Sequence, residues 1–312
     1  MLLLTAAIYA RGFARLHRQM PERFPIWRLA AFMGGIGALF IAIASPLEEL
    51  DDLLLQIHMT QHLLLMIVAP TLLLAGAPAI ALVRGMPARI AKLTVGPILR
   101  STIVRRVFAW LTQPLVCWIA FVAATWGWHV PAAFQLALRS DGWHVVEHAC
   151  FLTTALMFWY PVIQPWPSTA RWSQWAIVPY LLLADGQNTV LAALFMFSNR
   201  LLYPLYASAP HVAGFTPQGD QIVAGAIMWV PGSIFYLVPA TLIMFQMLAP
   251  QNLSRNSAHE NEVRRGLAAE IPATPRLRKE TPCPNQPKLF CSTSAPPGRP
   301  CRPITIRFTA VT

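Results

Sequence analysis

The sequence is short of charged residues: Asp, Glu, Lys and Arg make up 12% of its 312 residues, about half of the ~25% that soluble domains carry. This shortage excludes an ordinary soluble enzyme. Close cysteine pairs are also missing, because none of the five cysteines belongs to a CxxC motif. Their absence excludes a zinc ribbon and leaves no disulfide framework. Hydrophobic residues make up 55% of the chain and gather in long blocks, which excludes disorder of the whole chain.

Six of these blocks are long enough to cross a membrane. A helix needs about 20 residues to cross ~30 Å of hydrocarbon at ~1.5 Å per residue. The predicted spans are Arg28–Ala44, Leu53–Val83, Val107–Trp126, His144–Ile163, Trp175–Phe197 and Ile222–Leu248. We therefore expect an all-α fold, a polytopic transmembrane helix bundle with six complete spans that occupies residues 28–249.

Residues 1–27 are expected to form an apolar N-terminal stub followed by a basic cytoplasmic segment. The first ten residues are apolar but too short to span. They are either an interfacial or signal-like stub, or the inner half of a partial additional span. A cleaved signal peptide agrees poorly with the sequence, because its basic region should precede the apolar stretch and Arg11 follows it.

The basic residues indicate how the spans are oriented. Of the 24 Lys and Arg residues, 22 lie in alternate segments: before the first span and after the second, fourth and sixth. The remaining loops hold only Arg139 and Arg200. Because cytoplasmic loops retain Lys and Arg, we expect a multi-pass protein of a bacterial inner membrane whose C-terminal tail is cytoplasmic. This placement argues against nucleic-acid binding, despite a net charge of +11.

The C-terminal tail, residues 250–312, differs in composition from the rest of the chain. It is rich in proline and basic residues, which predicts a disordered segment that lies near anionic membrane lipid. Its cysteines, Cys283, Cys291 and Cys301, are too widely spaced to indicate a metal site.

Histidine placement is the most informative local feature. Six of the eight histidines fall in predicted outer loops or outer parts of spans: His58, His62, His129, His144, His148 and His211. His58 and His62 are four residues apart, so both rings lie on one helical face, about 6 Å apart along the axis. Met59 is adjacent and Met66 continues the face. Imidazole and thioether donors together suit copper, with Cu(I) favoured by sulfur.

A second pair, His144 and His148, repeats this spacing with Glu147 beside it, and His129 precedes it. Asp185 and Gln187 lie within the fifth span, and Asp220 opens the sixth. A buried carboxylate needs a hydrogen-bond donor, a metal ion or a proton. The cluster is therefore either a metal site or a purely hydrogen-bonded network.

Three other functions are compatible with some of these residues. The sequence His144-Val-Val-Glu-His148 matches the HxxEH pattern of an intramembrane zinc metalloprotease, which would need Asp185 or Asp220 as a third ligand and leaves the first histidine pair without a role. Haem held between His62 and His148 is disfavoured because both pairs lie toward one surface.

The third alternative is a metal or small-molecule transporter. Pro70, Gly76 and Pro78 interrupt the second span, as broken transporter helices do, but no inverted repeat is visible.

Residues 27–248 resemble the polytopic CtaG family of cytochrome c oxidase assembly factors. The resemblance is carried by His58-Met-Thr-Gln-His62, Trp128-His-Val-Pro131, His144-Val-Val-Glu-His148 and Asp185-Gly-Gln187, with Asp220-Gln221 following. It implies a protein that is not an enzyme and that assists maturation of a haem–copper oxidase. Its partners would be cytochrome c oxidase subunits and its cofactor copper.

Carried over residue by residue, the resemblance implies a copper site formed by His58, Met59, His62, His129, His144 and His148. The surrounding polar network would be Glu147, Asp185, Gln187 and Asp220, with Glu147 orienting a histidine. Two departures stand out. The family has seven spans, whereas this chain begins part-way through the first, and the proline-rich tail lies outside the resemblance.

Overall fold

The computed structural model describes residues 1–51, 53–168, 172–208, 216–248, 281–282 and 290–291. The chain divides into two units, residues 1–249 and 250–312. The second unit contains one described feature, an antiparallel pair of two-residue strands, β1 (Thr281–Pro282) and β2 (Phe290–Cys291). The predicted disorder of residues 250–312 otherwise concerns residues outside this description.

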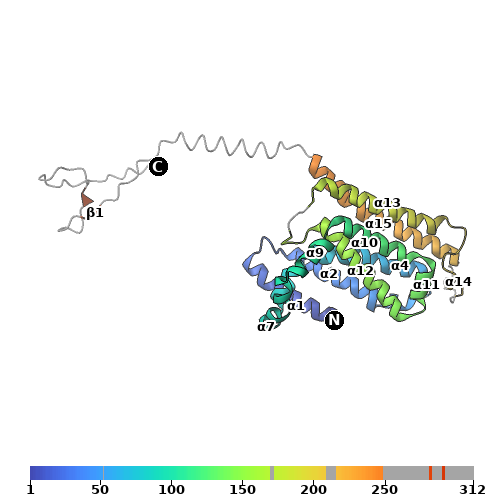
Figure 1. Ribbon diagram of the computed structural model, residues 1–312, viewed down its shortest axis with the longest axis horizontal. Helices are drawn as coiled ribbons and strands as arrows, with labels where there is room; N and C mark the ends of the chain where they lie inside the picture. Colours follow the sequence, from blue (N-terminus) through green and yellow to red (C-terminus); the bar gives the residue numbers. More distant parts are fainter. Residues whose placement is uncertain (52, 169–171, 209–215, 249–280, 283–289, 292–312) are drawn as a thin grey trace, which may run out of the picture. The chain divides into compact units, whose positions relative to one another are not determined.

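The first unit is built from helices (Figure 1). The long ones are α2 (Ile26–Ala44), α12 (Asp141–Ile163), α13 (Gln174–Phe197) and α15 (Pro217–Leu248). A fifth long stretch joins α4 (Leu55–Leu63), the π-helix η1 (Leu64–Val68) and α5 (Ala69–Ala75). The shorter helices are α1 (Leu2–Gln19), α3 (Leu47–Leu50), α6 (Pro78–Gly85), α7 (Ala88–Ile90), the π-helix η2 (Ala91–Val95), α8 (Gly96–Arg100), α9 (Thr102–Leu111), α10 (Pro114–His129), α11 (Pro131–Leu138) and α14 (Leu205–Ser208).

Five stretches in the described residues are long and apolar enough to span a membrane, and the bent pair α9–α10 makes up to six. The prediction of an all-α, multi-pass membrane protein is therefore confirmed. Large apolar side chains project from the outer faces of the spans; Phe40, Leu183 and Phe245 are 55%, 61% and 75% exposed. Such side chains suit contact with lipid, because hydrocarbon chains replace water there.

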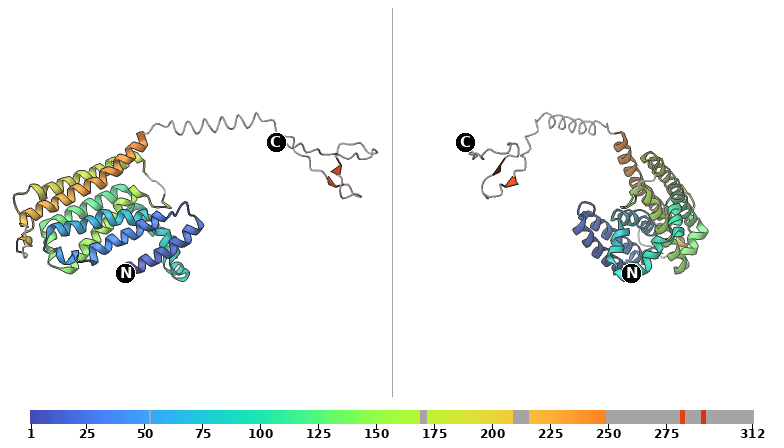
Figure 2. Two further views of the ribbon diagram at one scale, coloured as in Figure 1. Left: turned by 180° about the vertical axis from the view of Figure 1, so that it is seen from behind. Right: turned by 60° about the vertical axis from the view of Figure 1, so that its left-hand side comes forward.

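The stretch α4–η1–α5 is the central span. Of its residues 61% are buried, compared with 28–39% in the other four long spans. Helices α13 and α15 lie side by side (Figures 1 and 2). The central span packs against α2, α12 and α15, and His58, Gln61 and His62 on α4 are at most 3% exposed, so these polar groups face protein rather than lipid.

Pro70 accounts for the π-helix that interrupts the central span. Proline has no backbone N–H and its ring crowds the carbonyl four residues earlier, which here belongs to Met66. The chain widens into η1 just before this point. The indole Nε1 of Trp159 donates a hydrogen bond of 2.9 Å to the Met66 carbonyl, so a side chain of α12 supplies the donor that Pro70 lacks.

The second span is shorter than the apolar block Leu53–Val83 that was predicted to supply it. The helix ends at Ala75, and Ala77 adopts the left-handed conformation (φ 49°) before α6 begins at Pro78. Helix α6 instead packs against α1, the helix formed by the predicted N-terminal stub. A Cβ atom at Gly12 would lie 1.8 Å from the carbonyl oxygen of Ala81, so the close approach of α1 and α6 requires glycine there.

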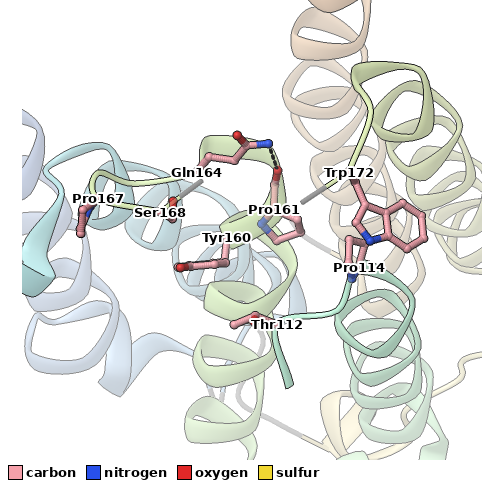
Figure 3. A pocket seen from close by; sticks show the side chains of 8 residues that line it. All are labelled: Thr112, Pro114, Tyr160, Pro161, Gln164, Pro167, Ser168 and Trp172. Carbon is pink, nitrogen blue, oxygen red and sulfur yellow. Dashed lines mark hydrogen bonds between the residues drawn. The ribbon is translucent and has the colours of Figure 1, made fainter. Parts of the chain in front are cut away.

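The predicted span Val107–Trp126 is also not continuous. Helices α9 and α10 meet at 66°, because a residue before proline is driven out of the helical conformation and Gln113, which precedes Pro114, is extended (ψ 130°). A pocket of about 180 Å³ lies at this break and at the C-terminal end of α12 (Figure 3). There Gln164 donates a 3.1 Å hydrogen bond to the Pro161 carbonyl.

The N-terminus of α4 is capped by a residue far away in the sequence. The residue before α4, Leu54, has no side chain that could cap it. Instead the Asp220 carboxylate, near the start of α15, accepts backbone N–H bonds from Leu55 (2.7 Å) and Gln56 (3.1 Å). A carboxylate also interacts favourably with the partial positive charge of a helix N-terminus, so Asp220 fixes where α4 begins.

We predict that Asp220→Asn lowers the free energy of unfolding by about 1–3 kcal/mol, because an amide nitrogen faces one backbone N–H and leaves it buried without an acceptor. Thermal unfolding in detergent measures the change. The matched control is Asp141→Asn, which neutralises an exposed acid in the first turn of α12. Equal shifts for the two variants would contradict the capping role.

Candidate functional site

Five histidines from three helices converge in one cluster. His58 and His62 come from α4, His129 ends α10, and His144 and His148 lie in the first turns of α12. The ring centroid of His58 lies 4.3 Å from the ring centroid of His62 and 5.3 Å from that of His144. The ring centroids of His144 and His148 lie 4.1 Å apart. The His62 centroid is 5.9 Å from that of His129 and 5.7 Å from that of His148. His211 lies outside the described residues.

Two buried carboxylates lie among these rings. The Glu147 oxygens are 3.8 Å from His58 Nε2 and 3.7 Å from His62 Nε2. The Asp51 Oδ2 atom is 3.5 Å from His144 Nε2 and 3.9 Å from His58 Nδ1. Both acids are at most 1% exposed. In the described part of the chain, every ion pair belongs to this cluster.

These separations suit atoms that share a metal ion. Direct N–H···O hydrogen bonds are about 2.7–3.2 Å long, shorter than all four. Two ligands that each lie ~2.1 Å from one tetrahedral ion are ~3.4 Å apart. In two groups of three, one possible ligand atom from each residue lies within 4.8 Å of the other two: Asp51, His58 and His144 (the Asp51 triad), and His58, His62 and Glu147 (the Glu147 triad). His58 belongs to both, through opposite ring nitrogens.

The polar atoms of the Glu147 triad make no hydrogen bonds to other described residues. Both ring nitrogens of His58 and His62, and both Glu147 oxygens, are buried without a hydrogen-bond partner there. Buried polar groups normally find such partners, since leaving one unsatisfied costs about 1–3 kcal/mol. A bound metal ion would satisfy several of these atoms at once, so the donor set fits a metal.

The tautomer of His129 follows from its surroundings. Its Nδ1 atom lies 2.6 Å from the Thr125 carbonyl oxygen, which can only accept, so Nδ1 carries the proton. The Nε2 atom then presents a lone pair, and it is buried without a hydrogen-bond partner among the described residues. A histidine oriented through a backbone carbonyl in this way is typical of metal ligands.

Tyr203, in the loop before α14, supports this end of α10. Its hydroxyl donates a 2.8 Å hydrogen bond to the His129 carbonyl oxygen. Burial, and secondarily the nearby Glu147 carboxylate, raise the pKa of the Tyr203 phenol well above its ordinary value. The phenol therefore keeps its proton and remains a donor.

The other predicted site residues are distributed differently. Met59 is 1% exposed and lines a small cavity beside His62. Asp220 caps α4, and Gln187 accepts a 2.9 Å hydrogen bond from Trp126 Nε1. Asp185 belongs to neither triad. Among the three acids assigned to a surrounding network, Glu147 is the one in the described chain whose carboxylate lies within 4 Å of a histidine nitrogen.

Asp51 was not predicted as a site residue. It lies in the acidic run Glu48-Glu49-Leu50-Asp51-Asp52, seven residues before His58. The loop between α3 and α4 brings it back over the cluster, where the Tyr206 hydroxyl donates a 2.9 Å bond to its carbonyl. An acidic residue seven positions before a histidine pair was the sequence signal that could have identified Asp51 as a site residue.

Comparison with known proteins decides the family. A model of the cytochrome c oxidase caa3 assembly factor family matches residues 7–249. The chain belongs to this family. The resemblance seen in the sequence is thereby confirmed, and it covers all of the helices that form the histidine cluster.

Two curated relatives of this chain are mycobacterial. The chain is 24% identical over 247 residues to ML1998 of Mycobacterium leprae, covering 76% of this chain and 36% of that protein. It is 27% identical over 165 residues to Mb0105 of Mycobacterium bovis, covering 52% of this chain and 25% of that protein. The chain thus spans about a third or less of these relatives' length. No solved structure matches.

The geometry of the described residues gives little support to the protease alternative. That mechanism needs Asp185 or Asp220 beside His144 and His148 as a zinc ligand. Asp220 is engaged with backbone amides of α4, and Asp185 is in neither triad of the described residues. Glu147 lies between His58 and His62, so the first histidine pair is part of the same site and not surplus to it.

We predict that Tyr203→Phe lowers the free energy of unfolding by about 1 kcal/mol, because the buried His129 carbonyl loses its donor. Chemical unfolding in detergent measures this loss. Tyr160→Phe is the control, since Tyr160 lines the pocket at the other end of α12. A Tyr203→Phe variant as stable as the wild type would contradict the assigned hydrogen bond.

Proposed function

We propose that this protein binds copper in the histidine cluster and aids its delivery to a haem–copper cytochrome c oxidase. Its role would be non-catalytic, and its partners the oxidase subunits that receive the metal. The protein would lie in a bacterial inner membrane with the cluster at the outer face and the tail in the cytoplasm. The family description supports work on cytochrome c oxidase; copper is our inference from the donor atoms.

The observation that carries the proposal is the unsatisfied Glu147 triad. Its three members, His58, His62 and Glu147, are at most 3% exposed and come from two helices. Their facing atoms are 3.7–3.8 Å apart, too far for hydrogen bonds and suitable for one ion. A protein without a cargo here would carry this arrangement as a pure loss of stability.

Two features favour copper over other metals. Magnesium and calcium prefer sites made entirely of oxygen ligands, whereas imidazoles dominate this cluster. Among N-binding divalent metals, affinity rises to a maximum at copper. Methionines beside the cluster add sulfur donors, which suit Cu(I). A membrane-embedded site also keeps bulk water away from an ion that must pass to another protein.

The positive charge of a bound ion also complements Glu147. This carboxylate is buried, and its ion pairs among the described residues are with His58 and His62. A carboxylate in an apolar interior needs a compensating charge or a proton. A copper ion held between Glu147 and the two imidazoles would provide that charge.

We predict that purified protein holds at least one copper ion per chain, and that His58→Ala/His62→Ala lowers copper affinity at least ~100-fold. Loss of groups that merely support a ligand already costs ~10–100-fold, and this variant removes two members of the Glu147 triad. Metal analysis after competition with a chelator gives the affinity. His17→Gln is the control, because His17 lies on α1 beside Phe24.

The same variants test the role in the cell. In a strain that lacks the gene, the wild type and His17→Gln should restore cytochrome c oxidase activity, whereas the double variant should not. Immunoblotting confirms that each variant accumulates in the membrane. Wild-type copper affinity and full oxidase activity in the double variant would overturn the proposed function.

A further inference from the structure

A small cavity lies directly beside the Glu147 triad and has a different chemistry. Its volume is about 30 Å³, enough for one ion, since a water-sized sphere needs only ~10–15 Å³. Three methionines and two histidines line it: Met59, Met66, Met228, His62 and His129. No carboxylate is among its described lining residues. We call it the thioether cavity.

The methionines come from separate parts of the fold. Met59 lies on α4, Met66 on the π-helix η1, and Met228 on α15. All three are at most 8% exposed. Methionine often fills irregular gaps in apolar cores, and that role would leave no space between the side chains. Here the three side chains surround a space together with two imidazoles.

The imidazoles offer free lone pairs at the cavity. His129 carries its proton on Nδ1, which faces the Thr125 carbonyl, so its Nε2 is a bare donor atom. Both ring nitrogens of His62 are buried without hydrogen-bond partners among the described residues. His62 Nε2 faces Glu147, and His62 also lines the thioether cavity. His62 therefore belongs both to the Glu147 triad and to the lining of the thioether cavity.

We propose that the thioether cavity is a second copper position, selective for Cu(I), which adjoins the Glu147 triad through His62. This inference rests on the proposed copper-binding function. Thioether sulfur is a soft donor that selects Cu(I), whereas carboxylate and imidazole accept divalent ions such as Zn(II) and Cu(II). The two adjacent positions thus differ in the oxidation state of copper that they favour.

His129 connects the thioether cavity with a larger hollow. This hollow, of about 470 Å³, lies between α10 and α13, and its lining includes Trp126, Val130 and Phe197 as well as His129. Among the described lining residues, His129 alone belongs to both spaces. A metal position needs an entry path, and His129 is the described residue at which the hollow borders this cavity.

The test uses Met66→Leu/Met228→Leu in the full-length protein. Leucine and methionine have similar volumes, so the exchange preserves core packing and removes only the sulfur donors. Met196→Leu/Met244→Leu is the matched control: it makes the same exchange on α13 and α15, away from both metal positions. Thermal unfolding of each apo-protein shows that the fold is retained.

Two measurements are made on each protein. Cu(I) affinity is determined anaerobically by competition with a chromogenic chelator, and Zn(II) affinity is determined as a probe of the carboxylate positions. We expect the Met66→Leu/Met228→Leu variant to bind Cu(I) at least ~10-fold more weakly and to bind Zn(II) as the wild type does. The control variant should match the wild type with both metals.

X-ray absorption of Cu(I)-loaded wild type gives an answer that does not depend on any variant. Sulfur neighbours around copper, lost in the double variant, support the thioether cavity. Copper surrounded only by nitrogen and oxygen, or unchanged Cu(I) affinity in the double variant, overturns this inference while leaving the proposed function in place. A wild type that binds no copper defeats the proposed function itself.

Discussion

The position of helix α4 is the constraint on which the site depends. Asp220 holds its first turn by accepting two backbone N–H bonds, whereas Leu54, the residue before α4, has no side chain that could do this. One turn later Gln61 donates a 3.1 Å hydrogen bond to the Ala42 carbonyl at the end of α2. Further along the same span, Trp159 bonds the Met66 carbonyl. Polar contacts with α15, α2 and α12 therefore fix the rotation of α4 and present His58 and His62 to α12.

This rigidity has a consequence for the metal site. In an apolar bundle, unsatisfied carboxylates and imidazoles destabilise the fold, so neighbouring helices must hold them in place. The fixed α4 and the first turns of α12 provide such a frame, which is what a site of defined geometry requires. The same arrangement places a hard donor, Glu147, 3.7 Å from His62 Nε2, and His62 also lines the cavity that holds the methionines. For the proposed copper delivery, donors of unequal strength would serve both retention and release of the ion.

Local patterns predicted much of this correctly. The four-residue spacing of His58 and His62, and of His144 and His148, placed each pair on one helical face, and the apolar blocks gave the spans. Features that depend on contacts between distant residues were beyond such patterns. Nothing near Leu55 indicates that Asp220, far away in the sequence, caps its helix. The role of Asp51 depends on a loop that folds back over α4. The break at Pro114 and the π-helix before Pro70 were signalled by proline, but their geometry depends on Trp159 and on the packing of α12.

The central claim is that one ion can lie between α4 and α12, bound by side chains of both. The most direct measurement is an experimental structure of the copper-loaded protein with anomalous scattering recorded at the copper absorption edge. The account predicts an anomalous peak among His58, His62 and Glu147, with any second peak beside Met66 and Met228. A peak elsewhere in the protein, with the imidazoles of α4 and α12 turned away from one another, would contradict it.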